Sequence, residues 1–249
     1  DSGQDKEILK PVFRDALKSI YLTAESKDFV SDYLSSAPKD ILSFREKLEH
    51  DIVIWQETIV DKHNNKKNLY YSIIKDRIAA YNLKDTVIIT TNYTNFAESI
   101  TGYKTAYLHG RLNWFEDVRT KQVEELSKFK VNQEIMPFIF IPSGIKPIVS
   151  LKQIEQYEIA RKALAEYELL CILGYSINTD DEHIENFIRE RLAREKKVVL
   201  FLYSAEKLPV NQQISFYKND FDNNPYFEIK TIKNVEDFEK GLNLALSGR

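Results

Sequence analysis

Asn92 and His109 are the two residues of this chain whose types and positions best fit chemistry, because each directly follows a short apolar run. The run 87–90 predicts a buried strand that stops at Thr91-Asn92-Tyr93, and 105–108 predicts a second strand that stops at His109-Gly110. An amide side chain both donates and accepts hydrogen bonds, so it can orient a sugar hydroxyl or a water. An imidazole, with a pKa near ~6.5, can act as a general base. Folds of alternating strands and helices gather such groups at strand carboxyl ends, so we expect one cleft.

Both residues also have a plainer interpretation. Asn is common in turns and at helix amino ends, and a single His is more often structural than catalytic. A third polar cluster, Gly174-Tyr175-Ser176, follows the apolar run 169–173 and precedes a helix that Thr179-Asp-Asp-Glu182 would cap. Glycine permits close backbone approach and a helix amino end attracts phosphate, but an ordinary strand-to-helix turn has the same pattern.

The elements that must position these residues alternate along the second part of the chain. Short apolar runs predict strands at 86–90, 105–108, 137–141, 169–173, 198–203 and 226–232. Helical patterns lie between them, and one begins at the capping box Ser150-Leu-Lys-Gln153 and runs to about Glu168. This alternation predicts an α/β fold with a Rossmann-like, mostly parallel sheet and helices on both faces.

Residues 1–85 have a different character and predict a helical segment or subdomain. Apolar residues recur there at steps of three and four, as in the stretches 41–59 and 69–81. We therefore expect a helical part over 1–85 and a Rossmann-like core over 86–249, within one continuous domain.

Composition and charge exclude several classes of protein. The net charge of −3 and the pI near 5.9 argue against a protein whose main task is to bind nucleic acid. The single cysteine, Cys171, excludes an intrachain disulfide framework and a zinc site of four cysteines. No apolar run approaches the ~18–20 residues of a membrane helix and no leader opens the chain, so we expect a cytoplasmic protein without membrane partners.

Taken in order, the motifs resemble those of the sirtuin superfamily, and most of all the zinc-free SIR2-like domains of bacterial anti-phage defence proteins. The residues that carry the resemblance are Thr90-Thr91-Asn92-Tyr93, Leu108-His109-Gly110 and Gly174-Tyr175-Ser176, with Asp181 shortly after. The resemblance covers about residues 85–205.

The resemblance implies a reaction and a role for each motif. In the family, the asparagine holds the nicotinamide ribose and the attacking water, and the histidine is the general base; by position these are Asn92 and His109. The G-x-S turn of the family contacts the adenosine side of NAD, which would involve Gly174 and Ser176. Further binding residues would be Thr91, Tyr93, Tyr175 and Asp181. The implied activity is that of an NAD glycohydrolase that needs no metal, acts in anti-phage defence, and works as a homo-oligomer or with a partner defence subunit.

The chain also departs from the family pattern. Protein-deacetylating sirtuins have an aspartate two positions after the asparagine, where this chain has Thr94, and they carry a four-cysteine zinc module. NAD hydrolysis is therefore expected rather than protein deacetylation. The glycine-rich loop that takes the NAD phosphates in the family is not found in residues 1–86, so we expect the chain to lack its first strand and that loop. Alternatives are a non-catalytic module that binds NAD or ADP-ribose, and an interaction module like AbiH phage-exclusion proteins, which also have an N-Y-T turn and an H-G pair.

Overall fold

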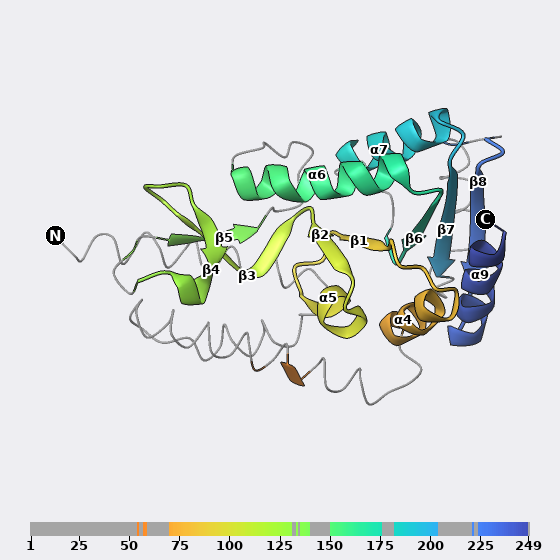
Figure 1. Ribbon diagram of the computed structural model, residues 1–249, viewed down its shortest axis with the longest axis horizontal. Helices are drawn as coiled ribbons and strands as arrows, with labels where there is room; N and C mark the ends of the chain where they lie inside the picture. Colours follow the sequence, from red (N-terminus) through yellow and green to blue (C-terminus); the bar gives the residue numbers. More distant parts are fainter. Residues whose placement is uncertain are drawn as a thin grey trace. The chain divides into compact units, whose positions relative to one another are not determined.

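The computed structural model describes a little over half of the chain (Figure 1). The described residues are 54, 57–58, 70–130, 133, 135–139, 150–175, 182–203, 221 and 224–248. Most of the expected amino-terminal helical segment therefore lies outside them, as do Ser176, Asp181 and the expected cap at Thr179. The chain divides into two compact units. Residues 87–142 and 146–158 belong to the first unit, and residues 66–86 and 159–249 belong to the second.

The second unit contains a parallel sheet of three strands in the order β6-β7-β8. These strands are β6 (Leu169–Leu173), β7 (Lys197–Tyr203) and β8 (Phe227–Ile232). Successive residues of a strand point to opposite faces. In β7, Val198 and Leu200 belong to one apolar cluster, while Val199 and Phe201 belong to another. A strand that is apolar on both faces requires a cover on both faces.

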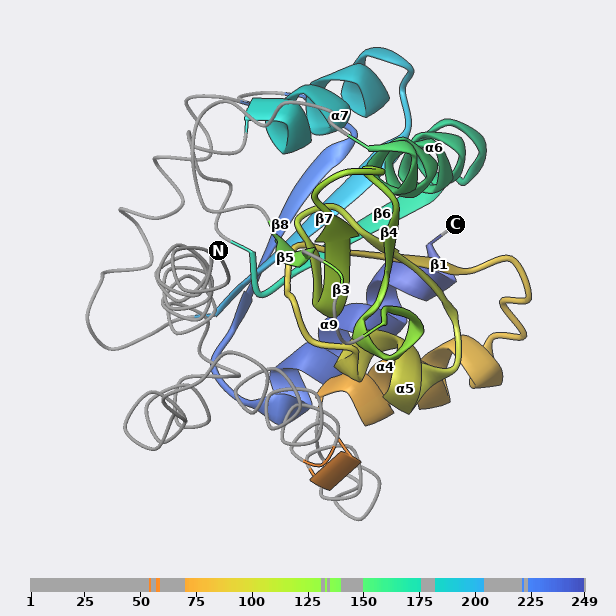
Figure 2. The same ribbon diagram turned by 90° about the vertical axis from the view of Figure 1, so that its left-hand side faces the viewer.

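Helices supply that cover (Figures 1 and 2). On one face lies α7 (Glu182–Ala193), whose Ile188 and Leu192 are buried in the cluster with Val198. On the other face lie α4 (Tyr70–Ala80) and α9 (Val235–Ser247). Gly241 of α9 brings the helix so close that an added Cβ would lie 3.0 Å from the Phe201 ring. The predicted α/β class, with a parallel sheet between helices, is confirmed here.

The first unit contains a parallel strand pair and the helix that connects it. The strands are β1 (Val87–Thr90) and β2 (Lys104–Tyr107), and the crossover helix is α5 (Phe96–Thr101). Their register pairs Thr90 with Tyr107, so both strands end at the same edge. Gly102 ends α5 with a φ of 74°, and its amide donates to the Glu98 carbonyl. Both strands were predicted to within a residue or two.

The same unit contains an antiparallel sheet that the apolar runs indicated only in part. Its strands are β3 (Gly110–Asp117), β4 (Val123–Glu125) and β5 (Ile135–Ile139), in the order β4-β3-β5, and a 3-10 turn covers Leu126–Lys128. Only β5 was expected, two residues later in the chain. Charged and amide residues interrupt the apolar residues of β3 and β4, so these segments show no apolar run.

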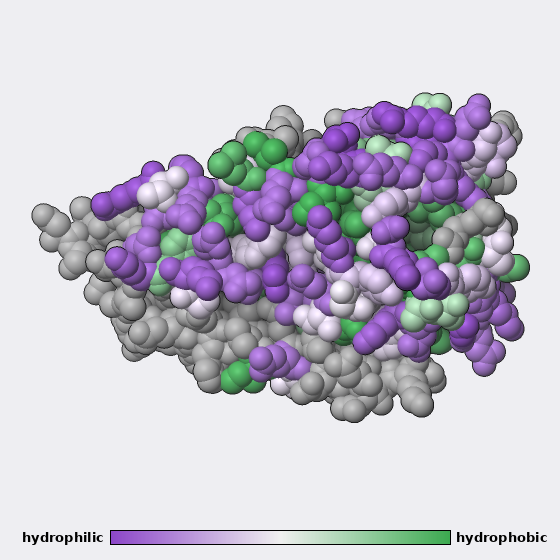
Figure 3. All heavy atoms as spheres, in the orientation of Figure 1, coloured by the Kyte–Doolittle hydropathy of each residue, from purple (hydrophilic) through white to green (hydrophobic). Residues whose placement is uncertain are grey.

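Helix α6 (Leu151–Glu166) begins where the capping box predicted. The backbone amide of Gln153 donates to Ser150 Oγ over 3.1 Å and so caps the helix. At the start of α6, glutamine side chains point inward and aliphatic side chains point outward. Gln153 and Gln156 are buried, whereas Leu151 is 83% exposed and Ile154 49% exposed. Figure 3 shows the resulting apolar patch over the first turn of α6.

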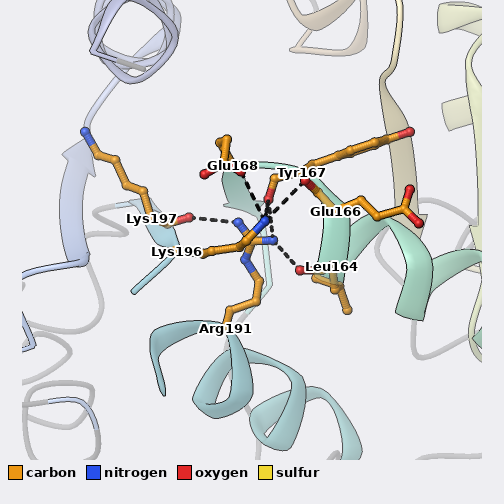
Figure 4. Close-up of polar contacts among 7 residues, drawn as sticks. All are labelled: Leu164, Glu166, Tyr167, Glu168, Arg191, Lys196 and Lys197. Carbon is orange, nitrogen blue, oxygen red and sulfur yellow. Dashed lines mark hydrogen bonds and ion pairs between the residues drawn. The ribbon is translucent and has the colours of Figure 1, made fainter. Parts of the chain in front are cut away.

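A buried arginine donates hydrogen bonds to the backbone carbonyls at the carboxyl end of α6. Arg191 of α7 donates to the carbonyls of Leu164, Tyr167 and Lys197 over 2.6, 3.0 and 3.3 Å (Figure 4). Lys196 donates to the Glu166 and Tyr167 carbonyls and to the Glu168 carboxylate. The last carbonyls of a helix have no partner within it, so these donors replace the missing bonds.

Candidate functional site

The Asn92 loop runs from the end of β1 to the start of α5. The backbone amide of Asn92 donates to the Thr90 hydroxyl over 3.1 Å, and this bond stabilises a turn directly after the strand. The amino-terminal cap position of α5 is Asn95, so Asn92 is not a helix cap. Thr91 and Asn92 are partly exposed, whereas Tyr93 and Thr94 are buried. The loop therefore offers the Asn92 side chain from a backbone that its buried neighbours hold in place.

The His109 turn joins β2 to β3. Gly110 begins β3 with a φ of 85°, a left-handed conformation that glycine adopts without strain, so the H-G pair has a structural reason. The His109 side chain is 5% exposed. The imidazole thus lies in a mostly buried turn at the carboxyl end of β2.

Backbone hydrogen bonds join the Asn92 loop to the His109 turn. The Leu108 amide donates to the Thr90 carbonyl over 3.0 Å, and the Leu112 amide donates to the Tyr93 carbonyl over 2.8 Å. The turn is thus bonded to the chain before and after Asn92. The sequence predicted this placement at neighbouring strand ends, and the catalytic roles of the two residues stay a prediction.

Two further residues that the sequence patterns did not single out, Gln156 and Glu98, contact the segment around His109. Gln156 of α6 accepts a hydrogen bond from the Tyr107 amide over 3.0 Å. Glu98 of α5 accepts from the Tyr107 hydroxyl over 3.1 Å, and its carboxylate lies 3.6 Å from the Arg111 guanidinium. Gln156 could have been found, because it shares a helix stripe with Ala160 and Ala163. Glu98 shows no such signal, because charged residues are ordinarily taken to be solvated, whereas Arg111 stands in the polar cluster His109-Gly110-Arg111 that follows the predicted strand.

Gly174 and Tyr175 follow β6 in the second unit. Gly174 has a φ of 61° and open space around its Cα, so its backbone conformation, and not crowding, favours glycine. Tyr175 is partly buried against the cluster that contains Ile172 and Ile188. Ser176 and Asp181 lie outside the described residues.

The described residues also bear on metals and membranes. No three His, Cys, Asp or Glu residues of the described part gather as ligands for a metal ion. None of the described helices is long and apolar enough to cross a membrane. Cys171 packs, partly buried, with the apolar residues that α4 and α9 cover.

Comparison with known proteins finds similarity to Sir2 structures only at the level of fold. No protein-family model and no curated sequence matches the chain. A complex of Sir2 with a p53 peptide and NAD⁺ matches with a TM-score of 0.48 at 14% identity, over 92% of this chain and 84% of that chain. A Sir2 homologue in complex with NAD gives a TM-score of 0.47 at 10% identity, over 83% and 75%. Sir2 with an inhibitor, 2'-O-acetyl-ADP-ribose and a deacetylated p53 peptide gives 0.45 at 14% identity, over 69% of each chain.

Proposed function

We propose that this chain is a SIR2-like NAD glycohydrolase module of a bacterial anti-phage defence protein. The observation that carries the proposal is the pairing of β1 with β2, which ends both strands at one edge, each followed by a residue of the right chemistry. An amide that orients water and a ribose hydroxyl, and an imidazole that accepts a proton, suit the hydrolysis of the glycosidic bond to nicotinamide. The hydrogen bonds between their loops support a common site.

In the proposed reaction, water attacks the anomeric carbon of the nicotinamide ribose. The Asn92 amide orients the water and a ribose hydroxyl, and His109 accepts the proton that the water loses. The bond from this carbon to the nicotinamide nitrogen breaks, and its electron pair leaves with nicotinamide. NAD⁺ and water thus become nicotinamide, ADP-ribose and one proton. Because the transition state is oxocarbenium-like, the placement of the water and of the base relative to the anomeric carbon is a main task of these residues.

The other candidate residues are assigned to binding. We assign Thr91 and Tyr93 to the nicotinamide ribose side of NAD, with the buried Tyr93 ring holding the loop. The residues assigned to the adenosine side are Gly174, Tyr175, Ser176 and Asp181. The left-handed backbone of Gly174 supports this assignment, because it turns the chain sharply at the end of β6. We propose that the protein acts in the cytoplasm, as a homo-oligomer or with a partner defence subunit.

One observation favours a second candidate function, a non-catalytic module that binds NAD or ADP-ribose, or an AbiH-like module. Asn92-Tyr93-Thr94 is the N-Y-T turn that AbiH phage-exclusion proteins also have, and Thr94 in this turn is 2% exposed. Calorimetry with NAD and ADP-ribose separates the two functions. Binding of either nucleotide without release of nicotinamide supports the second candidate, and nicotinamide release supports the hydrolase.

A further inference from the structure

Two side chains that flank His109 are both bound by one carboxylate of α5. Tyr107 stands two residues before His109 and Arg111 two residues after it. The Arg111 guanidinium carbon lies 5.3 Å from the centre of the Tyr107 ring, so the two side chains stack across the turn. Glu98 Oε2 accepts from the Tyr107 hydroxyl over 3.1 Å and lies 3.6 Å from Arg111 Nη1. The three side chains form one connected group.

Glu98 connects this group to the Asn92 loop. It lies on α5, the helix that the Asn92 loop leads into. The helix is held firmly, because Phe96, Ala97 and Ile100 are each 2% exposed. A carboxylate on a packed helix can therefore fix the residues on both sides of His109 relative to the loop that carries Asn92.

We propose that Glu98 is a positioning residue, which acts through Tyr107 and Arg111 to hold the His109 turn against the Asn92 loop. Its catalytic consequence rests on the NAD glycohydrolase function proposed above. General base catalysis is sensitive to the distance and angle at which the base meets the proton, so a loosened turn lowers the rate of the chemical step. Substrate binding, which many contacts share, changes much less.

The chain itself offers a matched control. Glu125 of β4 lies 3.8 Å from the same Arg111 Nη1, and its side chain is 45% exposed, against 47% for Glu98. The two carboxylates thus contact one guanidinium at nearly equal distance and exposure. They differ in what they connect, because Glu125 pairs with Trp114 inside the antiparallel sheet and touches neither the Asn92 loop nor α5 through any described contact.

Hydrogen exchange tests the positioning without any substrate. Glu98→Gln and Glu125→Gln are compared with the unchanged chain at the amides of Leu108 and Leu112, which donate across to the Asn92 loop. We expect both amides to exchange several-fold faster in Glu98→Gln and at the original rate in Glu125→Gln. Equal rates in all three proteins, or equal acceleration in both variants, would overturn the proposal. Thermal melting confirms that both variants fold.

Steady-state kinetics with NAD tests the catalytic consequence. We expect kcat of Glu98→Gln to fall about tenfold with KM unchanged, and Glu125→Gln to retain kcat, since misplacing a general base costs part of its ~10²–10⁴-fold contribution. Faster exchange with an unchanged kcat would overturn the positioning role. If the unchanged protein releases no nicotinamide, the proposed hydrolase function fails, while the exchange rates still decide whether Glu98 holds the turn.

Discussion

At the scale of single residues, the structure separates Asn92 from its plainer interpretation as a helix cap. Asn95 holds the cap position of α5, and Asn92 stands three residues earlier in a loop bonded to the His109 turn. The side chain of Asn92 is partly exposed, while Tyr93 and Thr94 beside it are buried. Asn92 is thus a polar residue of this loop that can be replaced without opening the core.

Replacement of Asn92 should therefore separate activity from stability. We expect Asn92→Ala to lower kcat for nicotinamide release by about 100-fold, because the water and ribose lose their orienting amide. Its melting temperature should stay within about 3 °C of the original, as for other surface changes. Kinetics and thermal unfolding of the same preparation check both. A large fall in melting temperature with the loss of activity would make Asn92 structural.

The residues that could be found in the sequence are those whose type is unusual for their position. A polar amide and an imidazole directly after apolar runs stand out, so the sequence marks Asn92 and His109 as candidates. Glu98 of α5 and Arg111 of β3 are 13 residues apart in the sequence, and their contact is a product of the tertiary fold. Single-sequence patterns report local periodicity, and they carry no signal for such a pair.

At the scale of elements, the junction between α6 and α7 depends on one buried cation. Arg191 is 2% exposed and donates to three carbonyls, two of them at the end of α6. Arg194 offers a matched comparison, because it pairs with Glu190 one helical turn away and its side chain is 53% exposed. The same charge is therefore buried and bonded to three carbonyls at one position, and largely exposed at the other.

Replacing each arginine by methionine should show how differently the two side chains contribute to the free energy of unfolding. We expect Arg191→Met to lower the free energy of unfolding by about 3 kcal/mol, because buried carbonyls lose their donors. Arg194→Met should lower it by about 0.3–0.5 kcal/mol, the usual value of an exposed pair on a helix. Urea unfolding of the two variants checks the prediction, and similar losses for both would contradict it.

We expect the stability of the turn between β3 and β4 to depend on pH through the carboxylate of Asp117. Its carboxylate accepts from the Thr120 and Arg119 amides over 2.7 and 2.8 Å and from the Gln133 amide group over 3.1 Å. The bond from the Thr120 amide, with the other bonds, lowers the pKa of Asp117 below its ordinary value. A lowered pKa means that the charged form stabilises the fold, so this stabilisation is present above the unfolded pKa and is lost as pH falls through the folded pKa.

Asp117→Asn isolates this contribution, since every other carboxylate titrates alike in both proteins. We expect the original chain to be the more stable at pH 7, with a difference that is complete above about pH 5 and shrinks below ~3.9, the usual unfolded value. Urea unfolding across this pH range measures it. A difference that stays constant down to pH 2.5 would show that the charge of Asp117 has no part in it.

Element prediction succeeded where a strand is a continuous apolar run and failed where it is not. The strand β7 is buried on both faces, and β6 packs partly buried against apolar clusters on both of its faces. Their sequences are therefore mainly apolar, and their bounds were predicted closely. In β3, Arg111, Asn113 and Glu116 interrupt the apolar residues, because these side chains find partners or partial exposure at the sheet surface. The antiparallel sheet was therefore largely invisible in the sequence.

At the scale of the whole molecule, the described part of the chain contains both parallel and antiparallel sheets. Parallel strands end in loops at one edge, and this is where Asn92 and His109 lie. The antiparallel strands begin at Gly110, directly after His109, and continue the turn into a small core of Tyr107, Trp114, Val123 and Phe138. The turn that carries His109 therefore lies where the parallel strand pair gives way to the antiparallel sheet.

Release of nicotinamide from NAD by the purified protein, with and without His109, tests the proposed function most directly. The unchanged protein should release nicotinamide and ADP-ribose in equal amounts, and His109→Ala should lose at least about 100-fold in kcat, the usual contribution of a general base. Glu125→Gln, made in parallel, should retain the activity. Full nicotinamide release by His109→Ala, or no release by the unchanged protein, would contradict the assignment of this chain as an NAD glycohydrolase.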